Sequence, residues 1–191
     1  MRGVDRYRSF AELPPPVPCA AKVADLLHAV VLLTAPLMAR QGITIGMSVQ
    51  PSDLHTVWDS QLVEQALLNL LKNATEALVA TSSPVIQIGA IATEEGGVVM
   101  TVANNGPALD DDIENLFLPF FTNKPGNAGI GLSIVRQVML SHSGAVTATN
   151  APDGPCFTLI FPSSDFRSHT IENQEIPLEE SEPHFGRRNL V

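Results

Sequence analysis

Apolar and polar positions recur with two different periods along the middle of the chain. In some segments apolar residues return every three to four positions, as in an amphipathic helix; in others every second position is apolar, as in a half-buried strand. The helical period covers residues 22–39, 61–80 and 131–143. The strand period covers residues 43–49, 85–92, 98–103, 146–150 and 157–161. This order predicts an α+β fold, a two-layer sandwich whose mixed, mainly antiparallel sheet packs on helices.

Turn and capping residues separate these segments. Residues 94–97 and the pair Asp153-Gly154 each sit between two predicted strands and predict hairpin turns. Asp59 and Ser60 are capping candidates for the helix over 61–80. Pro36 should kink or end the first helix. Residues 104–127 show neither period and are expected to be irregular.

Both ends of the chain differ from its middle. Residues 1–18 are polar and then proline-rich, which is typical of an extended linker. Residues 163–191 are rich in glutamate and poor in apolar residues, which is typical of a disordered acidic tail. We therefore expect a folded unit over 17–162, between a linker over 1–16 and a tail over 163–191.

Composition narrows the class of protein. Of 191 residues, 45% are hydrophobic and 16% charged, which suffices for a buried core. The formal net charge of −9 argues against nucleic-acid or anionic-membrane binding. The two cysteines, Cys19 and Cys156, are expected to be small apolar residues in a reducing compartment. The longest apolar run, 28–39, is short for a bilayer, so we expect a soluble chain without membrane contact.

Three amide side chains share one stripe of the predicted helix over 61–80. Gln65, Asn69 and Asn73 are spaced by four residues, and the opposite stripe is apolar. An asparagine in a helix is usually solvated. Two of them a turn apart nevertheless lower helix propensity, and amide oxygens are hard ligands that suit Mg²⁺ together with substrate phosphates. Both readings, solvated face and metal ligand, remain open from the residues alone.

Three loop segments add candidate chemistry. The glycine-rich run 126–132 leads into a helix, where backbone N–H groups could receive phosphate, although a plain flexible turn is the alternative. Asn104-Asn105-Gly106-Pro107 ends a strand and reads as a turn. Residues 116–124 hold three phenylalanines and Lys124. They are either a packed cluster or the anchor of a mobile lid, with Lys124 reaching a phosphate.

The order and spacing of these motifs closely resemble the catalytic ATP-binding domain of bacterial sensor histidine kinases, a member of the GHKL superfamily. The resemblance covers about residues 17–162. It implies the Bergerat fold, cytoplasmic location within a parent that could be membrane-anchored, and ATP and Mg²⁺ as cofactors. It also implies transfer of the γ-phosphoryl group to a histidine on a separate dimerisation segment, supplied in cis by a longer parent or in trans, with a response regulator as a further partner.

The resemblance also assigns roles by position. Asn73 matches the residue that coordinates Mg²⁺. Asn69 stands where ATP-hydrolysing relatives have a catalytic glutamate and cannot act as a base, which favours a kinase over a gyrase-type ATPase. Lys124 is a candidate for phosphate charge compensation. The nucleotide would contact three further groups of residues: Asn104 and Gly106; Phe117, Phe120, Phe121 and Thr122; and Gly129, Ile130, Gly131 and Leu132.

Two residues depart from the family's adenine-binding motif, Asp-x-Gly-x-Gly. Asn104 replaces the aspartate that accepts a hydrogen bond from the adenine amine, and Ala108 replaces the second glycine. Asparagine keeps one acceptor oxygen but loses the charge, which costs about 1 kcal/mol. Ala108 adds a Cβ that could cost about 1 kcal/mol more. Together the two changes could weaken nucleotide binding by roughly ten- to hundredfold.

Other functions remain as alternatives. The five histidines lack the context of a phosphoacceptor, so each is expected to be structural or solvated. The departures at Asn104 and Ala108 motivate a degenerate, non-catalytic module that docks a kinase or a response regulator. A protein-serine kinase that acts on an anti-sigma partner shares the fold and is a further alternative.

Overall fold

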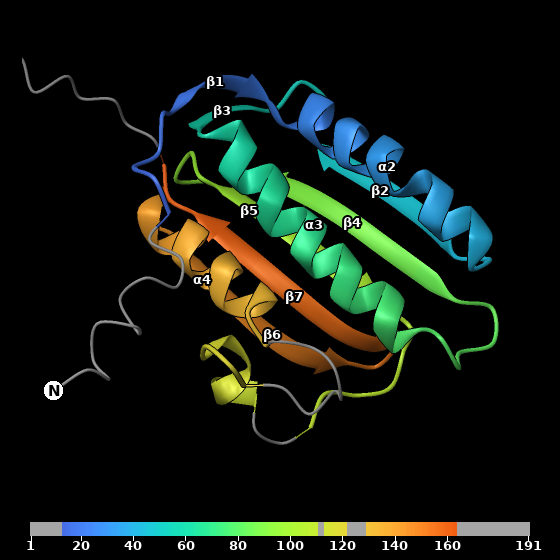
Figure 1. The fold of residues 1–191 in the computed structure, drawn as a ribbon. Coiled ribbons are helices and arrows are strands. Elements are labelled where there is room, and N and C mark those ends of the chain that lie inside the picture. The colour runs from blue at the N-terminus through green and yellow to red at the C-terminus, as the bar shows by residue number, and fades with distance from the viewer. Residues whose placement is uncertain (1–12, 111–112, 122–128, 164–191) are drawn as a thin grey trace, which may run out of the picture.

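The computed structural model describes residues 13–110, 113–121 and 129–163. A five-stranded sheet in the order β2-β4-β5-β7-β6 is covered on one face by three helices (Figure 1). The predicted α+β sandwich is therefore confirmed. The helices are α2 (Val23–Arg40), α3 (Ser60–Ala77) and α4 (Gly131–Ser141), with the short 3₁₀ helix η1 (Ile113–Phe117). The sheet strands are β2 (Thr44–Gln50), β4 (Val85–Ala92), β5 (Val98–Asn104), β6 (Ala145–Ala151) and β7 (Gly154–Phe161).

The sheet is mostly antiparallel, as the hairpin signals indicate. Only β2 runs parallel to its neighbour, β4, while the β4–β5, β5–β7 and β6–β7 pairs are antiparallel. Alternate residues of β5 are buried against the helices, and its last residue, Asn104, belongs to this buried set. Asn104 pairs with Ile86 of β4. Because alternate residues of β5 face the helices, the polar side chain of Asn104 also faces them, at the end of a central strand.

Helix α3 lies over the middle of the sheet between α2 and α4 (Figure 1). Its predicted apolar stripe is buried, and the members of this stripe are 0–4% exposed: Leu67, Leu70, Leu71, Ala74 and Leu78. The amide stripe stays half-buried at Asn69 and Asn73 and exposed at Gln65. Burial of the apolar stripe therefore determines which way the amides face.

Two short strands were missed by the sequence pattern. β1 (Cys19–Lys22) and β3 (His55–Trp58) form a separate antiparallel pair next to the main sheet. Each strand has four residues, and their pairing joins segments more than thirty residues apart along the chain. Period-two alternation cannot be recognised over so short a run, because tertiary pairing rather than local pattern stabilises it.

Helix α2 does not end at Pro36 but continues to Arg40. It is the one helix in the described ranges that is long and apolar enough to cross a membrane, judged by length and composition alone. Its residues Val23, Leu27 and Val30 are fully buried in the hydrophobic core. This face of α2 therefore contributes to the packing of the sandwich.

The start of α3 is capped as predicted. Asp59 Oδ1 accepts hydrogen bonds from the backbone N–H groups of Gln61 and Leu62 at 3.0 and 3.1 Å, and Oδ2 accepts one from Val17 at 2.8 Å. Burial raises the pKa of the Asp59 carboxyl, but these N–H groups and the nearby His142 lower it more, so its pKa lies below the ordinary value. The carboxylate form of Asp59 therefore stabilises the folded state.

His142 joins the end of α4 to the start of α3. Its Nε2 accepts a hydrogen bond from the backbone N–H of Asp59 at 3.0 Å, and its Nδ1 lies 2.8 Å from the carbonyl oxygen of Val138. The ring packs edge-on against Phe161. A structural role for this histidine agrees with the sequence expectation.

Replacing Asp59 with alanine should lower the free energy of unfolding by about 1 kcal/mol near neutral pH, since the N-cap is lost. Because the folded pKa is depressed, the stabilisation exists above the unfolded pKa of about 3.9 and is lost as pH falls through the folded pKa. Urea unfolding monitored by Trp58 fluorescence at pH 7 and at lower pH measures both effects. Asp59→Asn is the matched control: it should retain most of the cap but not its pH dependence. An alanine variant as stable as the parent at pH 7 would contradict this role.

Candidate functional site

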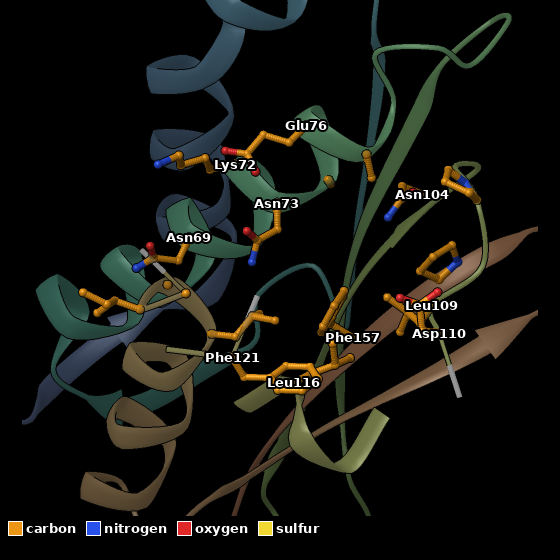
Figure 2. A pocket seen from close by; sticks show the side chains of 18 of the residues that line it. Asn69, Lys72, Asn73, Glu76, Asn104, Leu109, Asp110, Leu116, Phe121 and Phe157 are labelled. Carbon is orange, nitrogen blue, oxygen red and sulfur yellow. The ribbon is translucent and has the colours of Figure 1, made fainter. Parts of the chain in front are cut away.

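A cavity of about 640 Å³ lies between α3, the segment after β5 and the start of α4 (Figure 2). Its volume suits a ligand of the size of a small cofactor. Residues from five separate segments form its walls, and four of these segments had been marked as candidate chemistry in the sequence; the fifth is β7, with Pro155 and Phe157. The fold therefore brings together motifs that are up to about sixty residues apart along the chain.

Helix α3 supplies the two asparagines of the amide stripe. Asn69 Nδ2 donates to the carbonyl oxygen of Gln65 at 3.0 Å, so its Oδ1 remains an acceptor. This oxygen lies close to Gly131, where an added Cβ would sit 3.2 Å from it. Asn73 lines the cavity and has no hydrogen-bond partner within the described residues. Its amide oxygen is therefore available to a ligand or a metal ion.

The end of β5 supplies Asn104, which is 7% exposed and lines the cavity. Its Oδ1 accepts a hydrogen bond from the backbone N–H of Gly106 at 2.9 Å. The sequence predicts that this oxygen accepts a hydrogen bond from the adenine amine, but in the structure it already accepts one from Gly106. Gly154 lies against the backbone of Asn104 at a φ of +129°, and an added Cβ there would come within 2.2 Å of the Asn104 carbonyl oxygen. The first position of β7 therefore needs glycine, because a side chain there would collide with the end of β5.

Asn105 does not face the cavity but holds the strand end in place. Its Oδ1 accepts from the backbone N–H of Val85 at 2.8 Å, and its Nδ2 donates to the carbonyl oxygen of Ser83 at 3.0 Å. These bonds tie the turn after β5 to the start of β4. Asn104 thus lines the cavity, whereas Asn105 holds the turn after β5 in place. The sequence alone did not show this difference.

The start of α4 forms the glycine-rich side of the cavity. The predicted residues Gly129, Ile130, Gly131 and Leu132 all line it. Gly129 has a φ of +64°, and an added Cβ would sit 2.8 Å from backbone atoms of Phe120 and Phe121. Within the described residues, no side chain accepts a hydrogen bond from the N–H groups of the first turn of α4. These groups and the positive end of the helix dipole suit an anionic ligand.

The predicted aromatic residues lie in different places. Phe121 lines the cavity. Phe117 is 7% exposed in the core, edge-on to Phe157 with ring centroids 6.3 Å apart, and does not line it. Phe120 is 49% exposed, also away from the cavity lining, with a φ of +64°. Gly106 is not among the lining residues, and its backbone N–H donates to Asn104 Oδ1. Thr122 and Lys124 lie outside the described residues.

Charged residues at the cavity are few. In the sequence Lys72 is next to Asn73 but about 100° away on the helix surface, which predicts a solvated side chain. In the structure it is exposed and also lines the cavity. Glu76 and Asp110 also line it. Across residues 13–110, 113–121 and 129–163 there is no group of three His, Cys, Asp or Glu side chains that could hold a metal ion. A magnesium ion here would have Asn73 as a neutral ligand and would need further oxygen ligands from a bound phosphate, which fits its usual coordination.

Comparison with known proteins shows that the chain is similar to sensor proteins and histidine kinase catalytic domains. The C4-dicarboxylate transport sensor protein DctB of Rhizobium meliloti is 30% identical over 158 residues, covering 81% of this chain and 25% of DctB. The chain thus spans about a quarter of the length of that relative. The catalytic domain of histidine kinase ThkA superposes with a TM-score of 0.71 at 28% identity, covering 77% of this chain and 96% of that domain. Full-length ShkA in complex with AMPPNP superposes with a TM-score of 0.67 at 27% identity, covering 81% of this chain and 32% of ShkA.

A structure of ThkA in complex with the response regulator TrrA shares the fold, with a TM-score of 0.71 at 24% identity over 84% of this chain and 46% of that one. The family model of histidine kinase-, DNA gyrase B- and HSP90-like ATPases matches residues 58–165, which include the whole amide stripe, the end of β5 and the start of α4. Relatives and solved neighbours are sensor histidine kinases of two-component signalling. The chain belongs to the family of histidine kinase-, DNA gyrase B- and HSP90-like ATPases, as a histidine kinase catalytic domain.

Proposed function

We propose that this domain binds Mg²⁺-ATP in the cavity and transfers the γ-phosphoryl group to a histidine on a separate dimerisation segment. The observation that carries the proposal is that Asn73, Asn104 and the glycines at the start of α4 line one cavity of suitable size (Figure 2). The nucleotide analogue bound to ShkA, a structural neighbour, supports the same ligand class.

The cavity wall suggests how a triphosphate would be held. Asn73 would coordinate Mg²⁺ through its amide oxygen, and the ion would neutralise phosphate charge. Gly129 and Gly131 would let the backbone approach the phosphates, and the N–H groups of the first turn of α4 would donate to them. Lys72 is the only basic side chain among the cavity-lining residues of the described segments. Nucleotide binding should therefore depend strongly on Mg²⁺ and on backbone N–H groups, and little on basic side chains.

The arrangement favours phosphoryl transfer over hydrolysis. Asn69 lies next to Gly131 at the start of α4, and an amide cannot remove a proton from water at neutral pH. The domain would then position the nucleotide and stabilise charge, while the acceptor histidine supplies the nucleophile. Lys124 remains a proposed source of charge compensation.

The proposed partners follow from the kinase assignment. A phosphoacceptor histidine would approach the γ-phosphate from a dimerisation segment, and a response regulator would receive the phosphoryl group. ThkA, which has the same fold, forms a complex with its response regulator. We place the domain in the cytoplasm, within a parent that could carry a membrane anchor, and propose residues 17–162 as its boundaries.

A second candidate is a docking module that no longer binds nucleotide. The specific observation in its favour is the hydrogen bond between Asn104 Oδ1 and the N–H of Gly106, which engages the acceptor expected to meet adenine. Such a module would keep the fold and its partner surfaces but not the kinase reaction.

Titration of a fluorescent ATP analogue into the purified 191-residue chain distinguishes these two functions. We expect saturable binding with a dissociation constant in the tens to hundreds of micromolar, or roughly −5 to −6 kcal/mol. Removing Mg²⁺ with EDTA should weaken binding at least about tenfold, since Asn73 and the backbone alone cannot neutralise three phosphates. Absence of saturable binding at millimolar nucleotide with Mg²⁺ would reject the kinase proposal and favour the docking module.

A further inference from the structure

Asn104 is the buried polar side chain at one end of the cavity. It lies across the cavity from Asn69, on the same side as the exposed Asp110 (Figure 2). The lining residues nearest to it in the chain or against its backbone are apolar: Pro107 and Ala108 follow it in sequence, and Pro155 follows Gly154, which lies against the Asn104 backbone. An apolar surround with one buried polar group suits a flat purine base rather than a phosphate. The atom that Asn104 turns toward the cavity should therefore select among bases.

The hydrogen bond to Gly106 determines which atom that is. A backbone N–H can only donate, so it must meet the oxygen of the Asn104 amide, which fixes the orientation of that amide. Asn104 Nδ2 has no acceptor within the described residues. It is also absent from the fully enclosed, unpartnered side-chain atoms of these segments, where only Trp58 Nε1 is found. Nδ2 therefore reaches the cavity, and Figure 2 shows the amide nitrogen on the cavity side of Asn104.

From this geometry we propose that the site prefers purine nucleotides that carry an oxygen at C6, such as inosine or guanosine triphosphate, over ATP. The inference rests on the proposed nucleotide-binding function and concerns only the base. A 6-amino group is a donor, whereas a 6-oxo group is an acceptor. An amine placed at Asn104 Nδ2 would set two donors against each other, while an oxygen there accepts the N–H.

An aspartate at this position would reverse the preference. One carboxylate oxygen would keep the bond to the Gly106 N–H, and the other would face the cavity as an acceptor. It would then accept from the adenine amine and repel a 6-oxo group. A buried polar group that meets the wrong partner loses its hydrogen bond and its hydration together, so the discrimination is expected to be large.

The test compares ATP with inosine triphosphate, which differs from ATP only in the C6 oxygen and the proton on the neighbouring N1. Each nucleotide, with Mg²⁺, displaces a fluorescent ATP analogue from the purified chain. The parent chain should bind inosine triphosphate about tenfold more tightly than ATP, equivalent to about 1.4 kcal/mol. Asn104→Asp should reverse this order, with ATP binding more tightly by a similar factor.

Gln87→Glu is the charge-matched control. Gln87 is exposed on β4, where alternate residues point away from the helices, so its substitution adds the same negative charge far from the cavity. This variant should keep the nucleotide preference of the parent chain. An equal shift in both variants would mean that net charge rather than the amide sets the preference, and would overturn the inference.

The outcomes separate this inference from the proposed function. If both nucleotides bind but the parent chain prefers ATP, or if Asn104→Asp leaves the ratio unchanged, the assignment of Asn104 is wrong while nucleotide binding stands. If neither nucleotide displaces the analogue, or the analogue itself does not bind, the proposed function fails and the base preference fails with it.

Discussion

Replacing Asn73 with alanine is expected to weaken Mg²⁺-dependent nucleotide binding by about tenfold to a hundredfold without unfolding the domain. The side chain lines the cavity and makes no hydrogen bond to the rest of the described structure, so its removal takes away a ligand and breaks no internal contact. Magnesium would then keep only water and phosphate oxygens, and the energy lost would be about 1.4 to 2.7 kcal/mol. Fluorescent nucleotide titration with Mg²⁺ measures the loss directly.

The matched control is Gln65→Ala, two turns earlier on the same stripe of α3. Gln65 is exposed and does not line the cavity, so its substitution also removes an amide from this stripe but should leave the dissociation constant unchanged. In EDTA, the parent chain and the Asn73 variant should bind nucleotide about equally. A variant that binds as tightly as the parent with Mg²⁺, or one whose defect is as large in EDTA, would show that Asn73 is not the metal ligand.

Replacing Leu67 with alanine is expected to lower the free energy of unfolding by about 3 kcal/mol. Leu67 is fully buried where α3 covers the sheet, so truncation loses apolar burial and leaves a cavity that rigid neighbours fill only in part. Urea unfolding followed by the fluorescence of Trp58, the only tryptophan, reports the change. Because a typical domain is stable by 5–15 kcal/mol, the loss should be readily measured.

Leu32→Ala is the control for this substitution. Leu32 also lies in a helix, α2, but is 73% exposed. The same chemical change there should alter stability by less than about 0.5 kcal/mol. If the two variants were equally stable, α3 would not form the center of the core, and the orientation of its amide stripe would need another explanation.

Leu67 and Asn73, both on α3, show how the hydrophobic core and the candidate site depend on each other. The leucines of α3 pack against the sheet, and this packing turns the amide stripe toward the start of α4. Asn69 and Gly131 approach closely there because glycine has no side chain. A loss of packing in α3 should therefore weaken nucleotide binding as well, whereas loss of Asn73 should not weaken the packing.

Much of the architecture could be predicted from local pattern. Strand β4 was predicted with its observed bounds, the Asp59 cap was recognised, and the helix ends differ from their predicted positions by at most three residues. Apolar periodicity is a strong signal over seven or more residues because burial of one face imposes it. Strands β1 and β3 were missed because four residues are too few to show a period, and η1 because it lies within the segment expected to be irregular.

The candidate site was predicted as a set of residues rather than as a geometry. Sequence spacing placed Asn69 and Asn73 on one face of α3 and the glycines at the start of α4. It did not separate Phe121, which lines the cavity, from Phe117, which packs in the core, because both belong to one short aromatic run. Nor did it show Lys72 at the cavity rim. The angular position of a residue on a helix does not reveal whether neighbouring segments leave a cavity beside it.

By itself, the sequence determined the two-layer fold, the amide stripe and the family, because periodicity and the spacing of motifs are properties of the chain. Only the tertiary structure decided what Asn104 offers to a ligand. The amino acid has one acceptor oxygen and one donor nitrogen, and its type does not say which of them faces the cavity. The N–H of Gly106 takes the oxygen, so the nitrogen is left for the base. Hydrogen-bond direction depends on what surrounds a side chain, and those surroundings exist only in the folded protein.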